Sequence, residues 1–396
     1  MTADPQSFRG VARKLGDVLQ FRNEIVHPKD NPTGIMTFVG LEHIQRETGI
    51  RTGSETVDLE QLTGRRARFQ AGDIVYGYLR PYLNKVWIAE FGGICSVDQY
   101  VFKVRPIADR NYVYHFLRSP EFLKTAPIDT APGQLPRIRS GEISATPIPL
   151  PPLDEQKRIA AILDKVDQLR QKRRQALALL DSLTQSIFLE MFGDPLSEAS
   201  SFERFQMKEI AELINGDRSS NYPSQDDLVD SGILFLNTTN ITDDGIDLDR
   251  CNFITAEKFK SLGRGKLKEG DIVITLRGSL GQAAIFDCGN DTGFINAQMM
   301  IIRTNHLVDQ EYLLSFLKLD RMQKHFKKIG SGSAVPQLTG KQMSDLRVPL
   351  PPSELQVEFS RRISQLRVKR RLLKQGEQVL ASLFSSLQHR AFSGQL

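Results

Sequence analysis

The pattern of apolar positions predicts two long amphipathic helices, one near the middle of the chain and one at its end. In the first, apolar residues recur at alternating steps of three and four, and Arg173 is the single polar residue on the stripe. The second stripe is similar and is interrupted by Arg370 and Glu377. Such spacing is typical of helices that pair in a coiled coil. The two stripes are Ile159, Ile162, Val166, Leu169, Ala176, Leu180, Leu183 and Ile187, and Phe359, Ile363, Leu366, Leu373, Leu380, Phe384 and Leu387.

Each predicted helix follows the same proline-rich segment, Pro-Leu-Pro-Pro, at 149–152 and at 349–352. Proline fixes its own φ angle and disfavours helix at the residue before it, so each segment predicts a stiff, extended entry. Asp154 and Ser353 are suited to cap the helices. Glycine is expected to end both helices, in Gly-Asp-Pro at 193–195 and in Ser-Gly-Gln-Leu at 393–396.

Outside the two helices, short runs of β-branched and aromatic residues bounded by glycine or aspartate predict strands. Segments with helical apolar spacing follow them. The remaining chain is therefore expected to be mixed α/β (α+β). The predicted strands are 72–79, 100–104, 233–237, 270–276 and 298–304, and the predicted shorter helices are 111–119 and 311–326.

The chain also repeats itself over a long interval. Ala-Gly-Asp-Ile-Val from Ala71 is answered by Glu-Gly-Asp-Ile-Val from Glu269, and the landmarks that follow keep their order. Gly72 lies 77 positions before Pro149, and Gly270 lies 79 positions before Pro349. Two copies of one scaffold explain this agreement better than chance does. The expected organisation is a first domain at 1–150, a first helix at 151–194, a second domain at 195–350 and a second helix at 351–396.

The two helices are expected to run antiparallel. A helix of roughly 35 residues spans on the order of 50 Å, so the first helix carries the second domain far from the first. The second helix starts at that distant domain, and its nearest partner is the first helix approached from the far end. The predicted fold is therefore two pseudo-symmetric globular domains separated by an antiparallel two-helix coiled coil. Two domains separated by about 50 Å could enter major grooves of B-DNA that lie more than one turn apart.

Charge and composition narrow the function only slightly. The net charge is +5 and the pI is about 9.0, which permits a polyanionic partner without requiring one. The three cysteines are far apart and the six histidines are scattered, so neither a disulfide framework nor a metal site is predicted. The sequence shows neither a signal peptide nor a run of about 18 apolar residues, so a cytoplasmic location without membrane insertion is expected.

Three short motifs that suggest catalysis have more ordinary explanations. Leu-Thr-Gly-Lys-Gln at 338–342 lacks the earlier glycine and the following Ser/Thr of a phosphate-binding loop. Asn-Pro-Thr-Gly at 31–34 lacks the aromatic residue with which an adenine methyltransferase stacks its base, and a turn is favoured. Asp-Glu-Gln-Lys at 154–157 stands at a helix start, where acidic residues favour the helix dipole. The chain is therefore predicted not to be an enzyme.

The whole chain resembles the specificity subunit of a type I DNA restriction-modification system. The resemblance rests on two variable domains, each followed by a similar helix with the pattern at 149–156 and 349–356, although Leu355 replaces the Glu155 of the first copy. It implies that each domain is a target-recognition domain that reads half of a bipartite, asymmetric DNA sequence. It further implies that the helices set the spacer and dock two methyltransferase subunits, which bring in the restriction and translocase subunits. S-adenosylmethionine, ATP and Mg²⁺ are then expected on those partners, and no cofactor on this chain.

Candidate DNA contacts are polar and aromatic side chains expected on loops, because base edges are read by Arg, Asn and Gln and phosphates are held by Lys, Arg, Ser and Thr. Arg80 with Arg277, and Gln99 with Gln298, are taken as matched positions and therefore as backbone or scaffold contacts. For any single candidate, a solvated loop or a satisfied core amide is an equal alternative. The candidates are Tyr78, Arg80, Tyr82, Gln99, Tyr100, Gln134, Arg137 and Arg139 in the first domain, and Asn237, Thr239, Asn240, Arg277, Ser279, Gln298, Ser331, Ser333 and Gln337 in the second.

Basic side chains on the helices are candidates for binding the methyltransferase subunits or spacer phosphates, and the sequence does not separate the two. An alternative function of another class is a scaffold that binds two proteins through the same architecture. Salt-sensitive binding to duplex DNA distinguishes the two functions, because neutralising phosphates releases counterions. The partner-binding candidates are Lys172, Arg173, Arg174, Arg367, Lys369, Arg370 and Arg371.

Overall fold

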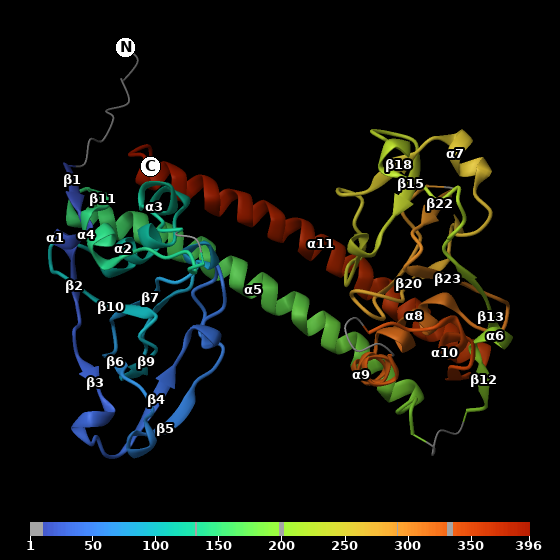
Figure 1. Cartoon of the computed structure of the whole chain (residues 1–396), viewed down its shortest axis with the longest axis horizontal. Coiled ribbons are helices and arrows are strands. Elements are labelled where there is room, and N and C mark those ends of the chain that lie inside the picture. Colours follow the sequence, from blue (N-terminus) through green and yellow to red (C-terminus); the bar gives the residue numbers. More distant parts are fainter. Residues whose placement is uncertain (1–10, 131–132, 198–201, 291, 331–335) are drawn as a thin grey trace, which may run out of the picture. The chain divides into compact units, whose positions relative to one another are not determined.

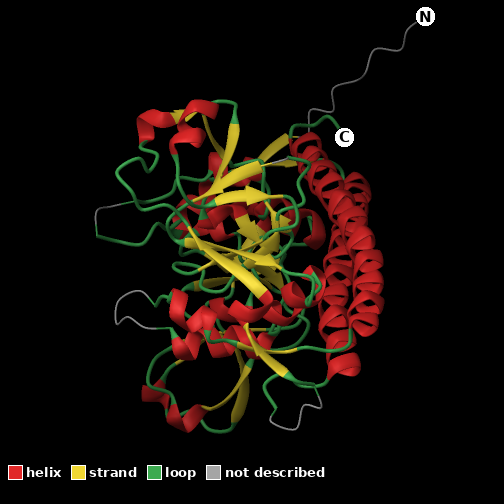
Figure 2. Cartoon of the chain, turned by 90° about the vertical axis from the view of Figure 1, so that its right-hand side faces the viewer, coloured by secondary structure: helices red, strands yellow, loops and turns green. Residues whose placement is uncertain are grey.

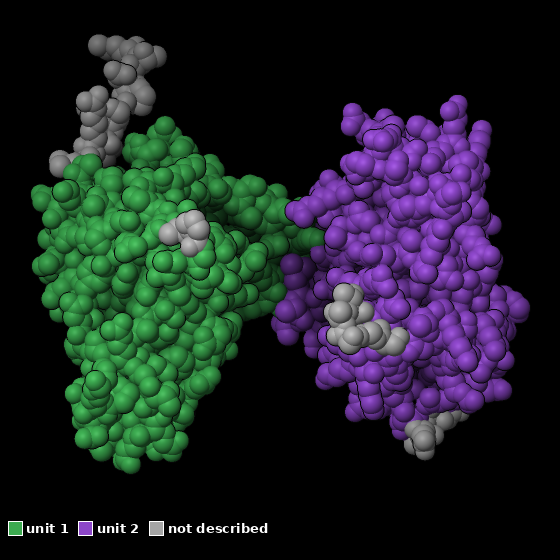
Figure 3. All heavy atoms as spheres, viewed as in Figure 1, with its two compact units in different colours: residues 1–176, 373–396 green, residues 177–372 purple. Residues whose placement is uncertain are grey.

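The computed structural model describes residues 11–130, 133–197, 202–290, 292–330 and 336–396. The chain divides into two compact units (Figure 3). Unit 1 comprises residues 1–176 and 373–396, and unit 2 comprises residues 177–372. Each unit therefore contains one globular domain together with a part of both long helices. The domain boundaries predicted at 150, 194 and 350 stay predictions.

Unit 1 contains a four-stranded sheet in the order β2, β10, β7, β8 and a five-stranded sheet in the order β3, β6, β9, β4, β5 (Figure 1). Only β4 and β9 pair in parallel among the described strands of these sheets. A separate antiparallel pair joins β1 to β11. The strands are β1 (Val11–Lys14), β2 (Leu19–Phe21), β3 (Ile25–Val26), β4 (Ile35–Val39), β5 (Glu55–Asp58), β6 (Arg66–Phe69), β7 (Ile74–Gly77), β8 (Val86–Ile88), β9 (Gly93–Cys95), β10 (Gln99–Val104) and β11 (Pro147–Leu150). The short helices are α1 (Leu15–Val18), α2 (Arg110–Leu117), α3 (Pro120–Thr125) and α4 (Ser140–Ala145), with 3-10 turns η1 (Pro28–Asp30), η2 (Leu41–His43), η3 (Leu59–Gln61) and η4 (Pro81–Leu83).

Unit 2 repeats this plan. Its four-stranded sheet has the order β13, β23, β20, β21, and its five-stranded sheet has the order β14, β18, β15, β22, β19. The strands are β12 (Arg204–Gln206), β13 (Ala211–Asn215), β14 (Leu228–Val229), β15 (Ile233–Leu236), β16 (Ile241–Thr242), β17 (Gly245–Ile246), β18 (Asn252–Ile254), β19 (Lys266–Lys268), β20 (Ile272–Thr275), β21 (Ala283–Ile285), β22 (Thr292–Ile295), β23 (Met299–Thr304) and β24 (Arg347–Pro349). The short helices are α6 (Met207–Ile210), α7 (Ala256–Ser261), α8 (Gln310–Lys318), α9 (Asp320–Ile329) and α10 (Gly340–Ser344), with 3-10 turns η5 (Gln225–Asp227) and η6 (Thr238–Asn240).

The two domains share one strand topology. The four-stranded sheets correspond strand for strand, and so do β5, β4, β9, β6 and β18, β15, β22, β19, including one parallel pair in each. The domains differ at the sheet edges, where β3 extends the first and β14 the opposite edge of the second. The predicted mixed α/β character and internal repeat are confirmed.

The long helices are α5 (Leu153–Phe192) and α11 (Ser353–Phe392), which lie side by side in both views (Figures 1 and 2). In unit 1, Arg174 of α5 pairs with Glu377 of α11 at 3.0 Å. In unit 2, Asp181 of α5 pairs with Arg370 of α11 at 2.8 Å. The residue number rises along α5 while it falls along α11, so the helices are antiparallel, as predicted.

The structure corrects the predicted seam of α5. Leu169 and Leu183 are both 43% exposed, whereas Leu163 and Phe188 are fully buried. The cause is that each end of α5 packs into the hydrophobic core of a domain as well as against α11. Those domain contacts decide which face of the helix turns inward.

The helix starts also differ from the prediction. The Pro152 carbonyl accepts the Gln156 N–H at 3.0 Å, and the Pro352 carbonyl accepts the Gln356 N–H at 3.2 Å. The last proline of each repeat, Pro152 or Pro352, therefore occupies the capping position, and Asp154 lies inside the first turn. The predicted glycine ends are confirmed, because both helices stop before Gly193 and Gly394, whose φ angles are 72° and 77°.

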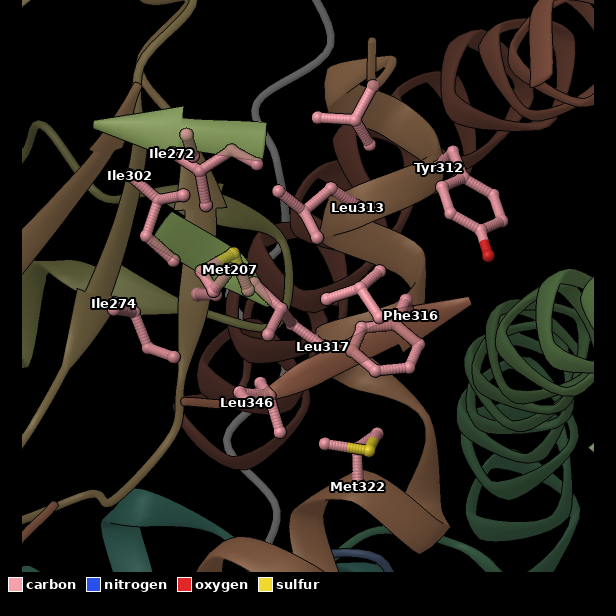
Figure 4. Close-up of a cluster of buried hydrophobic side chains, with 14 of the residues drawn as sticks. Met207, Ile272, Ile274, Ile302, Tyr312, Leu313, Phe316, Leu317, Met322 and Leu346 are labelled. Atoms are coloured by element: carbon pink, nitrogen blue, oxygen red, sulfur yellow. The ribbon is translucent and has the colours of Figure 1, made fainter. Parts of the chain in front are cut away.

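The main core of unit 2 lies between the four-stranded sheet and α8 (Figure 4). Leu313 of α8 lies on the side of the helix that faces Ile272 and Ile302 of the sheet, and Phe316 and Leu317 belong to the same cluster. The predicted helix 311–326 is divided into α8 and α9 by Leu319. This residue adopts an extended ψ of 138° and is 3% exposed, so burial of its side chain accompanies the break.

The glutamine of each proline-rich repeat joins the long helix to its domain. Gln156 Oε1 accepts the Asp109 N–H at 2.8 Å, and its Nε2 donates to the Pro151 carbonyl at 2.8 Å. Gln356 makes the same two bonds, to Asp309 N–H and the Pro351 carbonyl, at 2.8 Å each. Both glutamines are buried. The repeated motif thus encodes the joint between helix and domain.

Replacing Gln156 with alanine should lower the free energy of unfolding of unit 1 by about 3 kcal/mol, because it leaves a buried N–H and carbonyl without their partner. Urea unfolding followed by circular dichroism should show a lower midpoint for the variant than for the wild type. Gln168→Ala is the matched control, since Gln168 is exposed on the same helix. Equal midpoints for the two variants would contradict this role of Gln156.

Candidate nucleic-acid interface

Three predicted segments of the first domain meet at one end of its four-stranded sheet. The Tyr78 N–H donates to the Asp98 carbonyl at 3.3 Å, and the Ile138 N–H donates to the Tyr78 carbonyl at 3.2 Å. The Arg80 N–H donates to the Pro136 carbonyl at 2.7 Å. We call this assembly loop cluster 1, and it comprises residues 78–82, 96–100 and 133–139.

Aromatic rings form the floor of loop cluster 1. The rings of Tyr78 and Tyr100 stack with centroids 4.4 Å apart, and Phe21 meets Tyr100 edge-on at 5.4 Å. Burial raises the pKa of both tyrosine hydroxyls further above neutral pH. Such a surface combines apolar contact with hydrogen-bond donors.

Polar side chains surround this floor. Arg80, Tyr82, Gln134 and Arg139 are exposed, and Arg139 pairs with Asp129 at 2.7 Å. Arg137 is half-buried, and its backbone pairs with Asp129 through two hydrogen bonds of 2.8 and 3.0 Å.

Gln99 does not join the exposed candidates. It is 2% exposed, and its Oε1 accepts the Ser96 N–H at 3.1 Å. Its side chain therefore supports the turn at 96–99, and its assignment to DNA binding is corrected.

The second domain has an equivalent assembly at the same end of its four-stranded sheet. The Leu276 N–H donates to the Gln298 carbonyl at 2.8 Å, and the Leu338 N–H donates to the Leu276 carbonyl at 2.9 Å. Arg277 Nη2 donates to Gln337 Oε1 at 2.5 Å. We call residues 276–282, 296–298 and 336–339 loop cluster 2. Arg277, Ser279 and Gln298 are exposed there, whereas Ser331 and Ser333 lie outside the described residues.

The turn at 237–240 lies beside loop cluster 2, because the Asn296 N–H donates to the Leu236 carbonyl at 2.9 Å. Asn237 accepts the Thr239 N–H at 2.9 Å, and Thr239 is exposed. Asn240 is fully buried and donates to the carbonyls of Asp247 and Arg250 at 3.2 Å each. Asn240 therefore holds the loop together, and its assignment to DNA binding is corrected.

The structure also corrects the predicted matching of positions between the domains. Isolated bridges pair Leu79 with Arg137 and Arg277 with Gln337, so Arg277 is equivalent to Leu79 rather than to Arg80. The strand ladders place Gln99 opposite Gly77 and Met299 opposite Thr275. Gln298 is therefore equivalent to Asp98. Both predicted matches are wrong by one residue, so the shared role inferred from them has no basis.

The structure instead makes Arg137 of the first domain equivalent to Gln337 of the second. Arg137 and Gln337 occupy one position of the scaffold, because each bridges to the same strand extension and is followed by the same N–H bond, from Ile138 or Leu338. Helices α4 and α10 then begin shortly afterwards. The backbone at this position is the same in both domains, and the side chain differs.

Most of the partner-binding candidates on the helices have internal partners. Arg174 pairs with Glu377, Arg367 with Asp287 and Glu311, and Arg370 with Asp181 and Asp244. The Arg173 guanidinium lies across Gly376, where a Cβ would meet it at 2.9 Å. Arg174, Arg367 and Arg370 therefore take part in ion pairs within the units, and the assignment of all four arginines to partner binding stays a prediction. Lys172, Lys369 and Arg371 are exposed, with no ion pair to any described residue.

An exposed apolar stripe, missed by the sequence reasoning, lies on the side of each long helix away from the core. On α11, the exposed residues are spaced by four, seven and four positions: Val368, Leu372, Val379 and Leu383. This spacing places them on one side of the helix, opposite the buried Phe359 and Ile363. The sequence does contain this stripe, as a second set of apolar residues at helical spacing within the long helices. We call this set the outer face: Leu179, Leu183, Val357, Val368 and Leu372 in unit 2, and Leu169, Val379 and Leu383 in unit 1.

Residues 11–179 and 199–381 both match the family model of the type I restriction modification DNA specificity domain. The chain belongs to this family. The two specificity domains thus make it a DNA-recognition subunit of a type I system rather than a catalytic one. This confirms the predicted family and the predicted non-catalytic role.

Individual relatives share between 21 and 29% of their residues with this chain over the aligned segments. The EcoDI specificity subunit of Escherichia coli is 29% identical over 211 residues, covering 52% of this chain but only 45% of that subunit. The EcoBI specificity subunit of E. coli is 25% identical over 354 residues, covering 82% and 73%. The MjaVIII specificity subunit of Methanocaldococcus jannaschii is 21% identical over 320 residues, covering 77% and 75%.

Solved structures agree with the fold of the specificity domains and their helices. A type I restriction-modification S subunit from M. genitalium has a TM-score of 0.59 at 15% identity, covering 99% of this chain and 98% of that one. A chain from a structure of type I restriction-modification complex assembly and conformational transition has a TM-score of 0.53 at 20% identity, covering both chains fully.

One group of side chains in specificity domain 1 has the spacing of metal ligands. Ligand atoms of Glu42, His43 and Glu55 lie within 4.8 Å of one another. His43 Nδ1 accepts the Gly40 N–H at 3.0 Å, which leaves Nε2 facing Glu55 at 3.6 Å. Both glutamates are exposed, as solvated acidic groups commonly are. We therefore interpret the group as a cluster of polar side chains at the surface.

Among the helices of the described residues, none combines the length and the apolar content needed to cross a membrane.

Proposed function

We propose that the two specificity domains read the two unlike halves of one bipartite, asymmetric target in double-stranded DNA. The observation that carries this proposal is the equivalence of Arg137 and Gln337, which stand on the same backbone with different side chains. Arginine forms a bidentate pair with guanine in the major groove, and glutamine does so with adenine. One scaffold would then read different bases in its two copies.

The surroundings of this position support unlike half-sites. Loop cluster 1 offers the stacked rings of Tyr78 and Tyr100. In loop cluster 2, Leu276 takes the place of Tyr78, and Arg277 reaches Gln337. The side chain of Gln337 is therefore hydrogen-bonded to Arg277, whereas Arg137 belongs to the loop cluster that contains the stacked rings of Tyr78 and Tyr100.

We further propose that the long helices set the spacer between the half-sites and dock two methyltransferase subunits through the outer face. A row of exposed apolar side chains with charged neighbours supports this proposal, because such surfaces are typical of protein interaction sites. Restriction and translocase subunits would join through the methyltransferases. S-adenosylmethionine, ATP and Mg²⁺ would belong to these partners, so that this chain binds no cofactor itself and works with them in the cytoplasm.

Methylome sequencing tests the function. Cells that express this chain with the modification subunit of its system should carry a split motif with one methylated adenine on each strand. The same cells without the chain should lack it. If no such motif appears although the chain binds duplex DNA with steep salt dependence, the proposed reading of a bipartite target with this modification subunit is overturned. If DNA binding is also absent, the protein-binding scaffold becomes the better function.

A further inference from the structure

Helix α9 of specificity domain 2 has a basic side that no function above uses. Lys324, Lys327 and Lys328 are exposed, while Met322 and Phe326 on the other side are fully buried in the core. Within the described part of the chain, the three lysines have no ion pair, in contrast to Arg321 of the same helix, which pairs with Asp194. We call the three lysines the α9 basic face.

The arrangement is electrostatically unfavourable in the free protein. Lys324 lies three and four residues before Lys327 and Lys328, which is the spacing at which like charges on a helix repel each other. Lys327 and Lys328 stand in the last turn of α9, where the helix dipole favours positive charge. Their ammonium groups nevertheless have no ion-pair partner among the described residues. A ligand with several negative charges would relieve the repulsion.

The α9 basic face is attached to loop cluster 2. Gln323 Nε2 donates to the Gly281 carbonyl at 2.9 Å, which ties α9 to the loop that carries Arg277. At the other end, Gln342 Nε2 donates to the Ile329 carbonyl at 2.7 Å, which ties α9 to the segment just after Gln337. Both ends of the helix are thus bonded to the two segments that carry Arg277 and Gln337.

The equivalent helix of specificity domain 1 lacks most of this charge. Helix α3 ends at Thr125, and Lys124 stands where α9 has Lys324. Pro127 and Ile128 follow where α9 has Lys327 and Lys328. The extra turn of α9 therefore brings two additional positive charges to one domain only.

We propose that the α9 basic face binds the phosphate backbone of the half-site held by specificity domain 2. This inference rests on the proposed DNA-recognition function. Lysines on phosphates position a protein on the duplex and carry no sequence information. At this helix, domain 2 would therefore contact more phosphates than domain 1 does at α3.

The test is the salt dependence of duplex binding by the full chain carrying Lys324→Gln, Lys327→Gln and Lys328→Gln together. The slope of log K against log salt should become shallower by about 0.9 for each phosphate that a lysine no longer neutralises, so by about 2.7 for all three. The methylated motif should stay the same. A triple Lys→Arg variant keeps the charge and should keep the wild-type slope.

The outcomes separate the two proposals. If the wild-type chain binds duplex DNA with steep salt dependence and the triple Gln variant has an equal slope, the α9 inference is overturned and the proposed function stands. If the wild type shows no salt-dependent DNA binding, both are overturned. Equal circular dichroism spectra of the variants and the wild type exclude a folding defect, which is the expected result because the three lysines are exposed.

Discussion

Replacing Arg137 with glutamine should change one base pair of the methylated motif, from G·C toward A·T, in the half-site read by specificity domain 1. A bidentate arginine–guanine pair contributes about 1–3 kcal/mol of discrimination, so preference at that position should change by about 5- to 150-fold. The second half-site should stay unchanged, because its readout position belongs to the other domain. Methylome sequencing of cells that express the variant with the modification subunit measures both half-sites.

The reciprocal change, Gln337→Arg, should shift one base pair of the other half-site toward G·C. Arg105→Gln is the matched control, since Arg105 is exposed just beyond the opposite end of β10 from loop cluster 1. If both exchanges leave the motif unaltered while methylation persists, the assignment of position 137/337 to base reading fails.

Introducing glutamate at Leu179 and Leu372 should abolish assembly with the methyltransferase subunits, and methylation with it. Both side chains belong to the outer face of unit 2 and are 70% and 62% exposed, so the isolated chain should tolerate the change. In a docked complex, two unpaired carboxylates would have to be desolvated, which costs several kcal/mol and lowers the affinity by at least about 100-fold. Co-purification of the subunits and methylation of the target both report the effect.

Ser182→Glu combined with Gln378→Glu is the matched control for this pair. Ser182 and Gln378 are exposed on the same helices but flank the outer face. The control should assemble and methylate as the wild type does. Co-purification of the Leu179 and Leu372 variant at wild-type levels would show that the methyltransferase subunits dock elsewhere.

Local pattern was sufficient for the repeat, the strands around Gly72 and Gly270, and both long helices. These features depend on short-range properties: the periodicity of apolar side chains, the restricted φ of proline and the left-handed tolerance of glycine at Gly193 and Gly394. The pattern also placed most candidate DNA contacts on segments that meet at the ends of the four-stranded sheets. It even marked Gln156 and Gln356 as repeated, although not what they bond.

Long-range packing decided the rest. Asp181 and Arg370 are 189 positions apart, and no local rule pairs them. Two dipeptides of Leu and Arg, at 79–80 and 276–277, look equivalent in sequence, yet strand register offsets them by one residue and makes Arg137 and Gln337 the true counterparts. Leu169 and Leu183 fit a heptad but face outward, because α5 must satisfy a domain core at each end as well as its partner helix. Periodicity defines the sides of a helix, and only the surfaces packed against them determine which side is buried.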